Sequence, residues 1–328
     1  MVVALPSWDR PKLLLPFGSP RSRWLGSRLY PAFRVTARVH RLLVRVRVSA
    51  GMVAKRVADS EWVLEMLPEA GYSGLVPGAV IVGTGGPTQK ITVQLVDQNH
   101  APIAYLKYGQ TPGAVRRIYR EFSVLSQLTG DVAPDALWCG ALAGGSALMV
   151  SAVLGTPLEA NLPPGKEVID FLKSMPVLDT SPNLESVGWF RRLLAREPGA
   201  AKEIELLAGR AWPVVPVHGD FTPWNVLRVP GSSRLKAIDW EYGALDGVTG
   251  VDLAFYALQV SALVYRSAPN AGRESATGLL MSTLGYGYTE AEALTRLTAL
   301  DAYLNATEDG HAPAEALQLW RRQVWEGR

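Results

Sequence analysis

The sequence has few residues that could cross-link it or hold a soft metal: its 328 residues include one cysteine and four histidines. A single cysteine, Cys139, excludes an intramolecular disulfide framework and is typical of a reducing compartment. Because Cys139 lies in an apolar run, we expect a buried, inert thiol rather than a nucleophile. The histidines do not cluster in the sequence, which leaves little for a zinc site.

Long apolar segments are also missing. No uninterrupted apolar run approaches the roughly 18 to 20 residues that a bilayer-spanning helix needs. Apolar residues make up 48% of the chain and charged residues 19%, which is typical of a globular protein and not of a disordered one. The length suits one large domain or two lobes with a substantial core. We therefore expect a folded, cytoplasmic protein.

Acidic residues are scarce only at the start of the chain. Residues 1–57 contain twelve Lys or Arg and one acid, Asp9, whereas the remainder contains 21 Lys or Arg and 29 acids. We expect irregular structure over residues 1–31, which are rich in Pro, Ser, Gly and Arg. An Arg-rich, acid-poor start is also found in organellar transit segments. The sequence therefore predicts a basic segment attached to a mildly acidic remainder.

Residues 33–48 predict a basic amphipathic helix with two faces at helical spacing. The basic face contains Arg34, Arg38, Arg41 and Arg45, and the apolar face contains Val35, Val39, Leu42 and Val46. We expect the helix to pack on a small lobe with its arginines in solvent. The alternative is peripheral contact with an anionic membrane surface. Nucleic-acid binding is not expected, because no base-stacking aromatics interleave with the arginines.

The following segment predicts a β-hairpin whose turn is rich in glycine. Residues 80–82 and 91–96 have strand patterns. The glycines of the turn between them would let backbone amides approach phosphates without interference from side chains. Its candidate binding residues are Gly83, Gly85 and Gly86. The turn is neither a Walker loop nor a Rossmann fingerprint, since no helix follows it.

The next strand and helix predict an internal ion pair. Residues 103–108 form the predicted strand and include Lys107, and residues 114–128 form a predicted amphipathic helix. Glu121 flanks the apolar stripe of that helix, so we expect it to point inward and pair with Lys107. The alternative is that both residues are solvated surface charges.

The most informative stretch is residues 217–227, where a polar loop with Asp220 and Asn225 lies between apolar runs. A predicted short, buried strand then ends on Asp239. Phosphoryl transfer needs a carboxylate that orients and deprotonates the attacking hydroxyl, and oxygen ligands that hold magnesium on the phosphates. Asp220 suits the first role, and Asn225 and Asp239 suit the second. The alternative is an Asx-rich turn that only joins two strands.

The His-x-Asp-x-x-x-x-Asn spacing from His218 to Asn225, followed by Ile-Asp-Trp-Glu at residues 238–241, resembles the aminoglycoside phosphotransferase and choline kinase superfamily. These enzymes are small-molecule relatives of protein kinases. The resemblance covers residues 78–260. It implies an α+β, bilobal protein-kinase-like fold with a small antiparallel β N-lobe that has one main helix, and a larger, mostly helical C-lobe. The expected domains are a basic N-terminal extension (1–60), a nucleotide-binding N-lobe (61–152) and a catalytic, substrate-binding C-lobe (153–328).

The resemblance also implies roles for single residues. Lys107, paired with Glu121, would bind the α- and β-phosphates of a nucleotide, and the glycine-rich turn would cover it. Backbone groups near Ser151 to Val153 would hydrogen-bond the adenine.

Two further residues of the catalytic stretch have more than one reading. His218 is either a catalytic acid or a support of the loop, and we expect support. Asp252 opens a predicted helix over residues 253–263, so capping is its simplest role, although in relatives the corresponding Asp braces the catalytic loop.

These observations together predict an ATP-dependent kinase that moves a γ-phosphoryl group to a hydroxyl of an aminoglycoside-, choline- or sugar-like acceptor. Mg²⁺ is the expected cofactor, and GTP is an alternative donor. Trp240 and Glu241 replace the Phe-Gly that follows the metal-binding Asp in protein kinases, which favours a small-molecule acceptor. Alternatives are a membrane-surface kinase of an envelope or lipid-linked sugar, and a nucleotide-binding scaffold without turnover. The sequence identifies neither the acceptor nor the oligomeric state.

Overall fold

The computed structural model describes residues 2–9, 11–16, 20–29, 35–51, 55–56, 72 and 74–327. The chain divides into two compact units. The first contains Met1–Phe122 and Asp135–Ala152, and the second contains Ser123–Pro134 and Val153–Arg328. The domain boundary predicted at residue 60 lies outside the described residues, and the one predicted after residue 152 stays a prediction.

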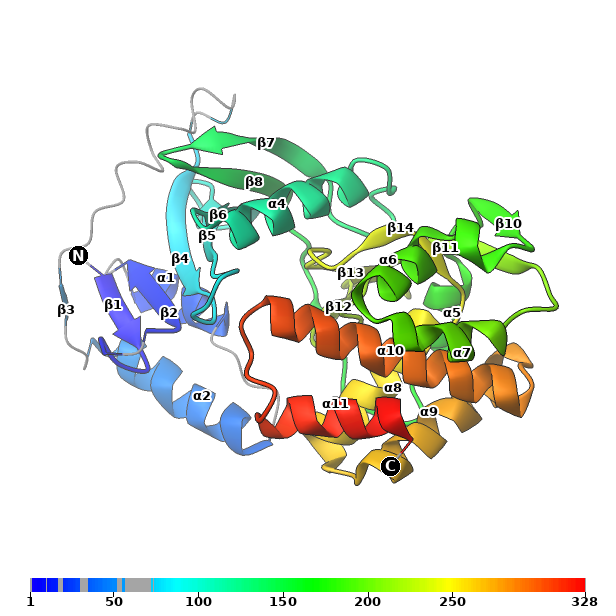
Figure 1. Ribbon diagram of the computed structural model, residues 1–328. Helices are drawn as coiled ribbons and strands as arrows, with labels where there is room; N and C mark the ends of the chain where they lie inside the picture. Colours follow the sequence, from blue (N-terminus) through cyan, green and yellow to red (C-terminus); the bar gives the residue numbers. More distant parts are fainter. Residues whose placement is uncertain are drawn as a thin grey trace. The chain divides into compact units, whose positions relative to one another are not determined.

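The first unit is built on an antiparallel sheet with the strand order β3-β1-β2-β4-β5-β6-β8-β7 (Figure 1). Its strands are β1 (Val2–Leu5), β2 (Leu13–Pro16), β3 (Lys55–Arg56), β4 (Val76–Val82), β5 (Ile91–Val96), β6 (Pro102–Gly109), β7 (Ala136–Leu142) and β8 (Gly145–Ser151). Alternate residues of the central strands, among them Leu95 and Leu106, are fully buried in the core of the sheet. The period-two pattern of apolar residues therefore places one face of each strand in the core.

The hairpin and the helix predicted for the small lobe are both present. β4 and β5 pair antiparallel with Val82 opposite Ile91, so residues 83–90 form the turn between them. Helix α4 (Pro112–Leu125) follows β6 and buries Ile118 completely. β6 also pairs with β8, which places it in the interior of the sheet, with a hydrogen-bonded strand on each side.

Ahead of the predicted small lobe, the chain adds α1 (Pro20–Gly26), the short 3-10 helix η1 (Ser27–Leu29) and α2 (Val35–Ser49). α2 is the predicted basic helix, and Val44 and Val48 fix it against the core of β1 and β2. The guanidinium of Arg45 lies 3.7 Å from the ring centroid of Trp24. The expectation that the arginines of this helix lie in solvent is therefore wrong for Arg45, because an aromatic face is available to it.

The apolar face predicted for α2 is directed differently from the expectation. Leu42 and Val46 belong to the predicted apolar face, yet their side chains are 53% and 51% exposed, and that of Leu43 is 59% exposed. The helix instead turns the side that contains Val44 and Val48 toward the core. Side chains of α2 before Leu42 lie outside the described residues.

The second unit is mostly helical and contains two three-stranded antiparallel sheets. Its α-helices are α5 (Lys166–Lys173), α6 (Gly188–Arg196), α7 (Ala201–Glu205), α8 (Val251–Val260), α9 (Pro269–Leu284), α10 (Tyr288–Glu308) and α11 (Ala316–Glu326). Short 3-10 turns, η2 (Leu184–Ser186) and η3 (Pro198–Ala200), flank α6, and α8 continues as the π-helix η4 (Ser261–Tyr265). One sheet has the order β10-β11-β14 and the other β13-β12-β9. Their strands are β9 (Thr156–Pro157), β10 (Asp179–Ser181), β11 (Trp212–Val217), β12 (Val226–Arg228), β13 (Leu235–Ala237) and β14 (Ala244–Val248).

Helix α8 is the centre of the second unit. All ten of its residues are buried, and α5, α9 and α10 pack against it (Figure 1). A helix that is buried on every side needs such complete cover, which α5, α9 and α10 provide. The predicted α+β fold class is confirmed: an antiparallel sheet with its helix α4 forms one unit, and a larger, mostly helical unit contains the catalytic stretch.

Candidate active site

The stretch proposed to be catalytic, residues 217–227, begins where β11 ends. His218, Gly219 and Asp220 follow Val217 directly, and Gly219 has a φ of +74°. A Cβ on Gly219 would lie 2.6 Å from the carbonyl oxygen of Tyr242. Both the left-handed backbone and this close approach require glycine, which places the Asp220 backbone in a fixed turn.

The side chain of Asp252 holds this turn through hydrogen bonds to its backbone. Its two carboxylate oxygens accept the backbone N–H groups of His218 (2.7 Å) and Gly219 (3.0 Å). The N-cap of α8 is Gly250, so the capping role predicted for Asp252 is wrong: the carboxylate is occupied by the loop amides. Burial raises the pKa of Asp252 to about 6, although the hydrogen bonds from the two backbone amides act to lower it. Bracing of the loop, which the resemblance implied, is the arrangement present.

The ring of His218 is buried and hydrogen-bonded on both sides. Nε2 lies 2.8 Å from the carbonyl oxygen of Ile238, which can only accept, and Nδ1 accepts the N–H of Asp220 at 3.2 Å. The ring also contacts the indole of Trp240, with 4.7 Å between centroids. Because both nitrogens are engaged within the protein, this geometry favours loop support over a catalytic acid.

Asp220 and Asn225 are in direct contact. The Asn225 side-chain N–H₂ donates to Asp220 Oδ2 at 2.8 Å and to the Asp220 carbonyl at 3.0 Å. Among the residues that the structure describes, no donor bonds to the amide oxygen of Asn225. The backbone carbonyl of Asn225 accepts the N–H of Ile238 at 2.8 Å, which ties the loop to the residue before Asp239.

Asp239 follows β13 in a left-handed conformation with a φ of +69°. Aspartate tolerates this region better than most residues do. Burial, and then the charges of Asp239 and Glu241, raise the pKa of Asp220 to about 8, while the charge of Arg321 and the bond from Asn225 lower it. The site therefore concentrates negative charge next to hard oxygen donors.

A magnesium ion fits this donor set. Asp239 and the Asn225 amide oxygen are the oxygen ligands that Mg²⁺ prefers, and a cation would offset the charge around Asp220. Among the described residues there is no group of three or more His, Cys, Asp and Glu side chains placed to hold a metal. Two protein ligands leave coordination positions for phosphate oxygens and water, as Mg²⁺ in nucleotide sites requires.

The first unit brings Lys107 and Glu121 together. Lys107 Nζ on β6 lies 2.5 Å from Glu121 Oε1 on α4, and Glu121 is completely buried. Cys139 lies nearby on β7 and is partly buried; burial, and then the charge of Glu121, raise the pKa of its thiol to about 11. A thiol with this pKa is protonated near neutral pH, as expected of an inert cysteine.

The three glycines proposed to bind phosphate differ in their surroundings. Gly83 donates to the carbonyl of Lys90, and a Cβ there would lie 2.5 Å from that oxygen, so Gly83 closes the hairpin. Gly85 faces open space, and Gly86 has a φ of +146°. Within the described part of the chain, the N–H groups of Gly85 and Gly86 have no acceptor, so these two are better suited than Gly83 to bind phosphate.

The residues proposed to bind adenine also differ. The N–H of Ser151 donates to the Asp135 carbonyl and that of Ala152 to the Ile103 carbonyl, both at 2.9 Å. The N–H of Val153 has no acceptor among the residues described. Of the two named in the sequence analysis, Val153 is the better candidate.

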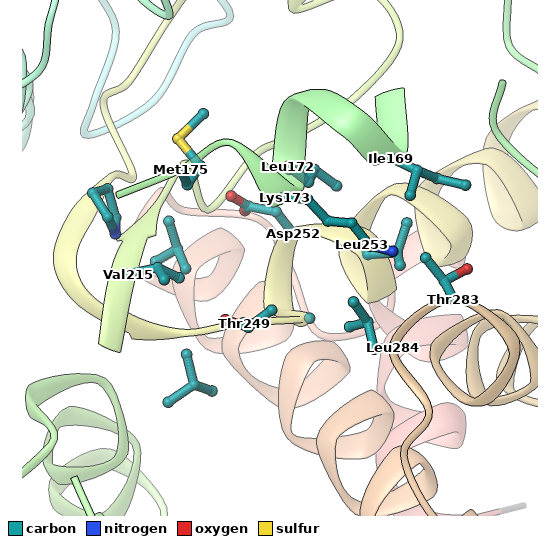
Figure 2. Close-up of a pocket in the computed structure, with 14 residues that line it drawn as sticks. Ile169, Leu172, Lys173, Met175, Val215, Thr249, Asp252, Leu253, Thr283 and Leu284 are labelled. Atoms are coloured by element: carbon teal, nitrogen blue, oxygen red, sulfur yellow. The ribbon is translucent and has the colours of Figure 1, made fainter. Parts of the chain in front are cut away.

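A small cavity of about 30 Å³ lies behind the catalytic turn (Figure 2). Asp252 and apolar side chains such as Met175, Val215 and Leu284 line it. This volume can accommodate about one water molecule, so the cavity is too small for a nucleotide or a sugar. It instead shows that Asp252 sits in apolar surroundings, which agrees with its raised pKa.

Arg321 on α11 is a residue of this region that the sequence analysis missed. Its charge acts on Asp220, although it lies far along the chain and no motif marks it. Only the fold brings the two together, so no local signal could have identified it.

Comparisons with known proteins give matches only among solved structures. No protein-family model and no curated sequence matches the chain. An aminoglycoside phosphotransferase from Streptomyces rimosus matches with a TM-score of 0.43 and 16% identity over 73% of this chain and 99% of that one. A fructosamine-3-kinase described from Haemophilus somnus gives 0.45 and 12% over 80% and 97%, and a Plasmodium vivax ethanolamine kinase gives 0.43 and 12% over 90% and 88%. We argue the function from the residues and not from these likenesses.

We expect Asp252→Asn to cost more stability at pH 5 than at pH 7. An unfolded Asp titrates near 3.9, but the folded pKa is about 6, so at pH 5 the folded chain holds a proton that the unfolded chain lacks. This contribution favours folding below pH 6 and is lost as the pH rises through 6. Asn has no such titration, so the cost should be larger at pH 5 by about 1 kcal/mol.

Urea unfolding of both proteins at pH 5 and pH 7 measures this difference. Asp179→Asn, at an exposed residue of β10, is the control. A cost that is equal at both pH values, or larger at pH 7, would contradict the raised pKa.

Proposed function

We propose that this protein is a kinase that transfers the γ-phosphoryl group of ATP to a hydroxyl of a small molecule. The observation that carries the proposal is the contact between Asp220 and Asn225. The amide N–H₂ of Asn225 orients the carboxylate, and its oxygen is left for a metal. This arrangement would place a base and a metal ligand in direct contact within one loop.

Asp220 would accept the proton of the acceptor hydroxyl, or hold that hydroxyl in line with the phosphoryl group. A pKa near neutrality is suited to general-base work, and burial contributes most to raising it. Asn225 and Asp239 would hold Mg²⁺, which when bound neutralises charge on the phosphates. In the first unit, Lys107, held by Glu121, would contact the α- and β-phosphates, and the N–H groups of the glycine-rich turn would cover them.

This proposal is tested by thermal unfolding with and without Mg·ATP, in wild type and in Asp239→Asn. At 100 times its dissociation constant, a ligand stabilises the native state by about 2.7 kcal/mol. We expect a magnesium-dependent rise in melting temperature in wild type that is much smaller in the variant. Asp179→Asn, exposed and remote in sequence from the loop, should behave as wild type.

The donor is identified by repeating the melts with GTP. A rise in melting temperature with GTP but not with ATP would support a kinase that uses GTP as its phosphoryl donor. No rise with either nucleotide at millimolar concentration, in the presence of magnesium, would contradict the proposal. If nucleotide binds but no tested acceptor leads to formation of ADP, the scaffold alternative is favoured.

A second candidate, a kinase that works at a membrane surface, is favoured by helix α2. Leu42, Leu43 and Val46 are each more than half exposed on a helix within the basic N-terminal segment. Anionic lipid headgroups would complement the basic residues, and the exposed side chains could enter the headgroup boundary. No helix among the described residues is long and apolar enough to span a membrane, so contact through α2 would be peripheral.

Co-sedimentation of the full chain with vesicles tests this candidate. We expect binding to phosphatidylserine-containing vesicles, no binding to pure phosphatidylcholine, and loss of binding in Leu42→Glu/Val46→Glu. Val177→Glu, at an equally exposed apolar residue of the second unit, is the control. Equal binding by both variants, or none by wild type at low salt, would exclude α2 as an anchor.

A further inference from the structure

Arg321 on α11 has one hydrogen bond among the described residues: its Nη1 donates to Gln318 Oε1 at 3.0 Å. Its Nε is withdrawn from solvent and has no acceptor. Within the described part of the chain, Arg321 forms no ion pair with a carboxylate. A guanidinium presents five N–H donors, and one left buried without an acceptor costs free energy. Arg321 therefore retains unused capacity for an acceptor group.

Its position is fixed by the groups around it. Gln318 in turn donates to the carbonyl of Tyr303 and to Thr307 Oγ1, so both ends of the Gln318 amide are used. This network joins α11 to the end of α10. There the Tyr242 hydroxyl donates a hydrogen bond to the Asp309 carboxylate.

The same network reaches the catalytic turn. The backbone of Tyr242 lies against Gly219, the residue before Asp220. A continuous set of contacts thus connects Asp220 with the corner between α10 and α11. Burial lowers the pKa of Arg321, and Asp220 is the strongest of the charges that oppose this shift. The two side chains are therefore within electrostatic range inside one unit.

We propose that Arg321 binds an anionic group, a carboxylate or a phosphate, on the hydroxyl acceptor and so directs its hydroxyl to Asp220. The Nε and Nη2 positions form the edge with which a guanidinium binds such groups through two parallel hydrogen bonds. This inference rests on the proposed function and narrows its acceptor to hydroxy acids or phosphorylated alcohols. It also excludes cationic acceptors as the main substrates, because the positive charge of Arg321 would repel them.

The experiment compares acceptors that share a hydroxyl and differ in a carboxylate: glycerate with glycerol, gluconate with glucitol, and pantothenate with pantothenol. ADP release with Mg·ATP is measured for each, and kanamycin and choline serve as cationic acceptors. We expect a higher kcat/KM for the anionic member of at least one pair. Arg321→Gln should lower that value by about 10- to 100-fold, mainly through KM, and change the neutral member less than about threefold.

Two variants control for structure. Arg321→Lys keeps the charge and should restore part of the preference, whereas Arg322→Gln, on the exposed side of α11, should behave as wild type. An equal loss for neutral and anionic acceptors in Arg321→Gln would overturn the proposal, because Arg321 would then act on the transferred phosphoryl group. Wild-type preference for a cationic acceptor would overturn it too.

Binding without turnover separates this inference from the proposed function. Thermal melts with glycerate, gluconate or pantothenate, in the absence of nucleotide, should show stabilisation in wild type and in Arg322→Gln but not in Arg321→Gln. Absence of any anion-specific stabilisation, together with no anionic preference in ADP release, would overturn the inference even where Mg·ATP binds. Absence of Mg·ATP binding would contradict the proposed function. The thermal melts with glycerate, gluconate or pantothenate would still decide whether Arg321 binds an anionic group.

Discussion

Two hydrogen bonds from backbone amides to one buried carboxylate organise the candidate active site of this molecule. Asp252 accepts the N–H groups of His218 and Gly219, and its helix α8 is buried along its whole length. A rigid core helix therefore fixes the turn that presents Asp220. Ionised Asp252 is unfavourable in these apolar surroundings, and the two amide donors partly offset that cost. The position of the proposed base, Asp220, thus depends on the buried carboxylate of Asp252, whose ionised form is only partly compensated for its loss of water.

A second constraint is electrostatic. The charges of Asp239 and Glu241 act on Asp220, and Asn225 adds a neutral oxygen. This excess of negative charge is unfavourable on its own and becomes useful when a cation and the phosphates that it carries are bound. In the other unit, Glu121 holds Lys107 in place, so each unit has a preorganised part of the proposed phosphoryl-transfer machinery.

The sequence predicted those features that depend on short-range patterns. The hairpin of β4 and β5 and the inward orientation of Glu121 follow from local periodicity, and the loop with Asp220 and Asn225 is identified from its residue types and their spacing. The role of Asp252 could not be derived in this way, because an Asp at a helix start reads as a cap unless another segment supplies the donors. Likewise, the exposure of Leu42 and Val46 depends on how α2 rolls against its sheet, and the placement of Arg321 depends on the packing of α10 and α11.

In the proposed function, Asp220 acts in the chemical step and is not needed for nucleotide binding. The most direct test measures Mg·ATP affinity by calorimetry and ADP release with hydroxyl acceptors, in wild type and in Asp220→Asn. Asn keeps the size of the side chain and removes its basicity. We expect an affinity within about threefold of wild type and a rate lower by about 10²- to 10⁴-fold. A variant with an unchanged rate, or one that loses nucleotide binding and rate together, would contradict this expectation.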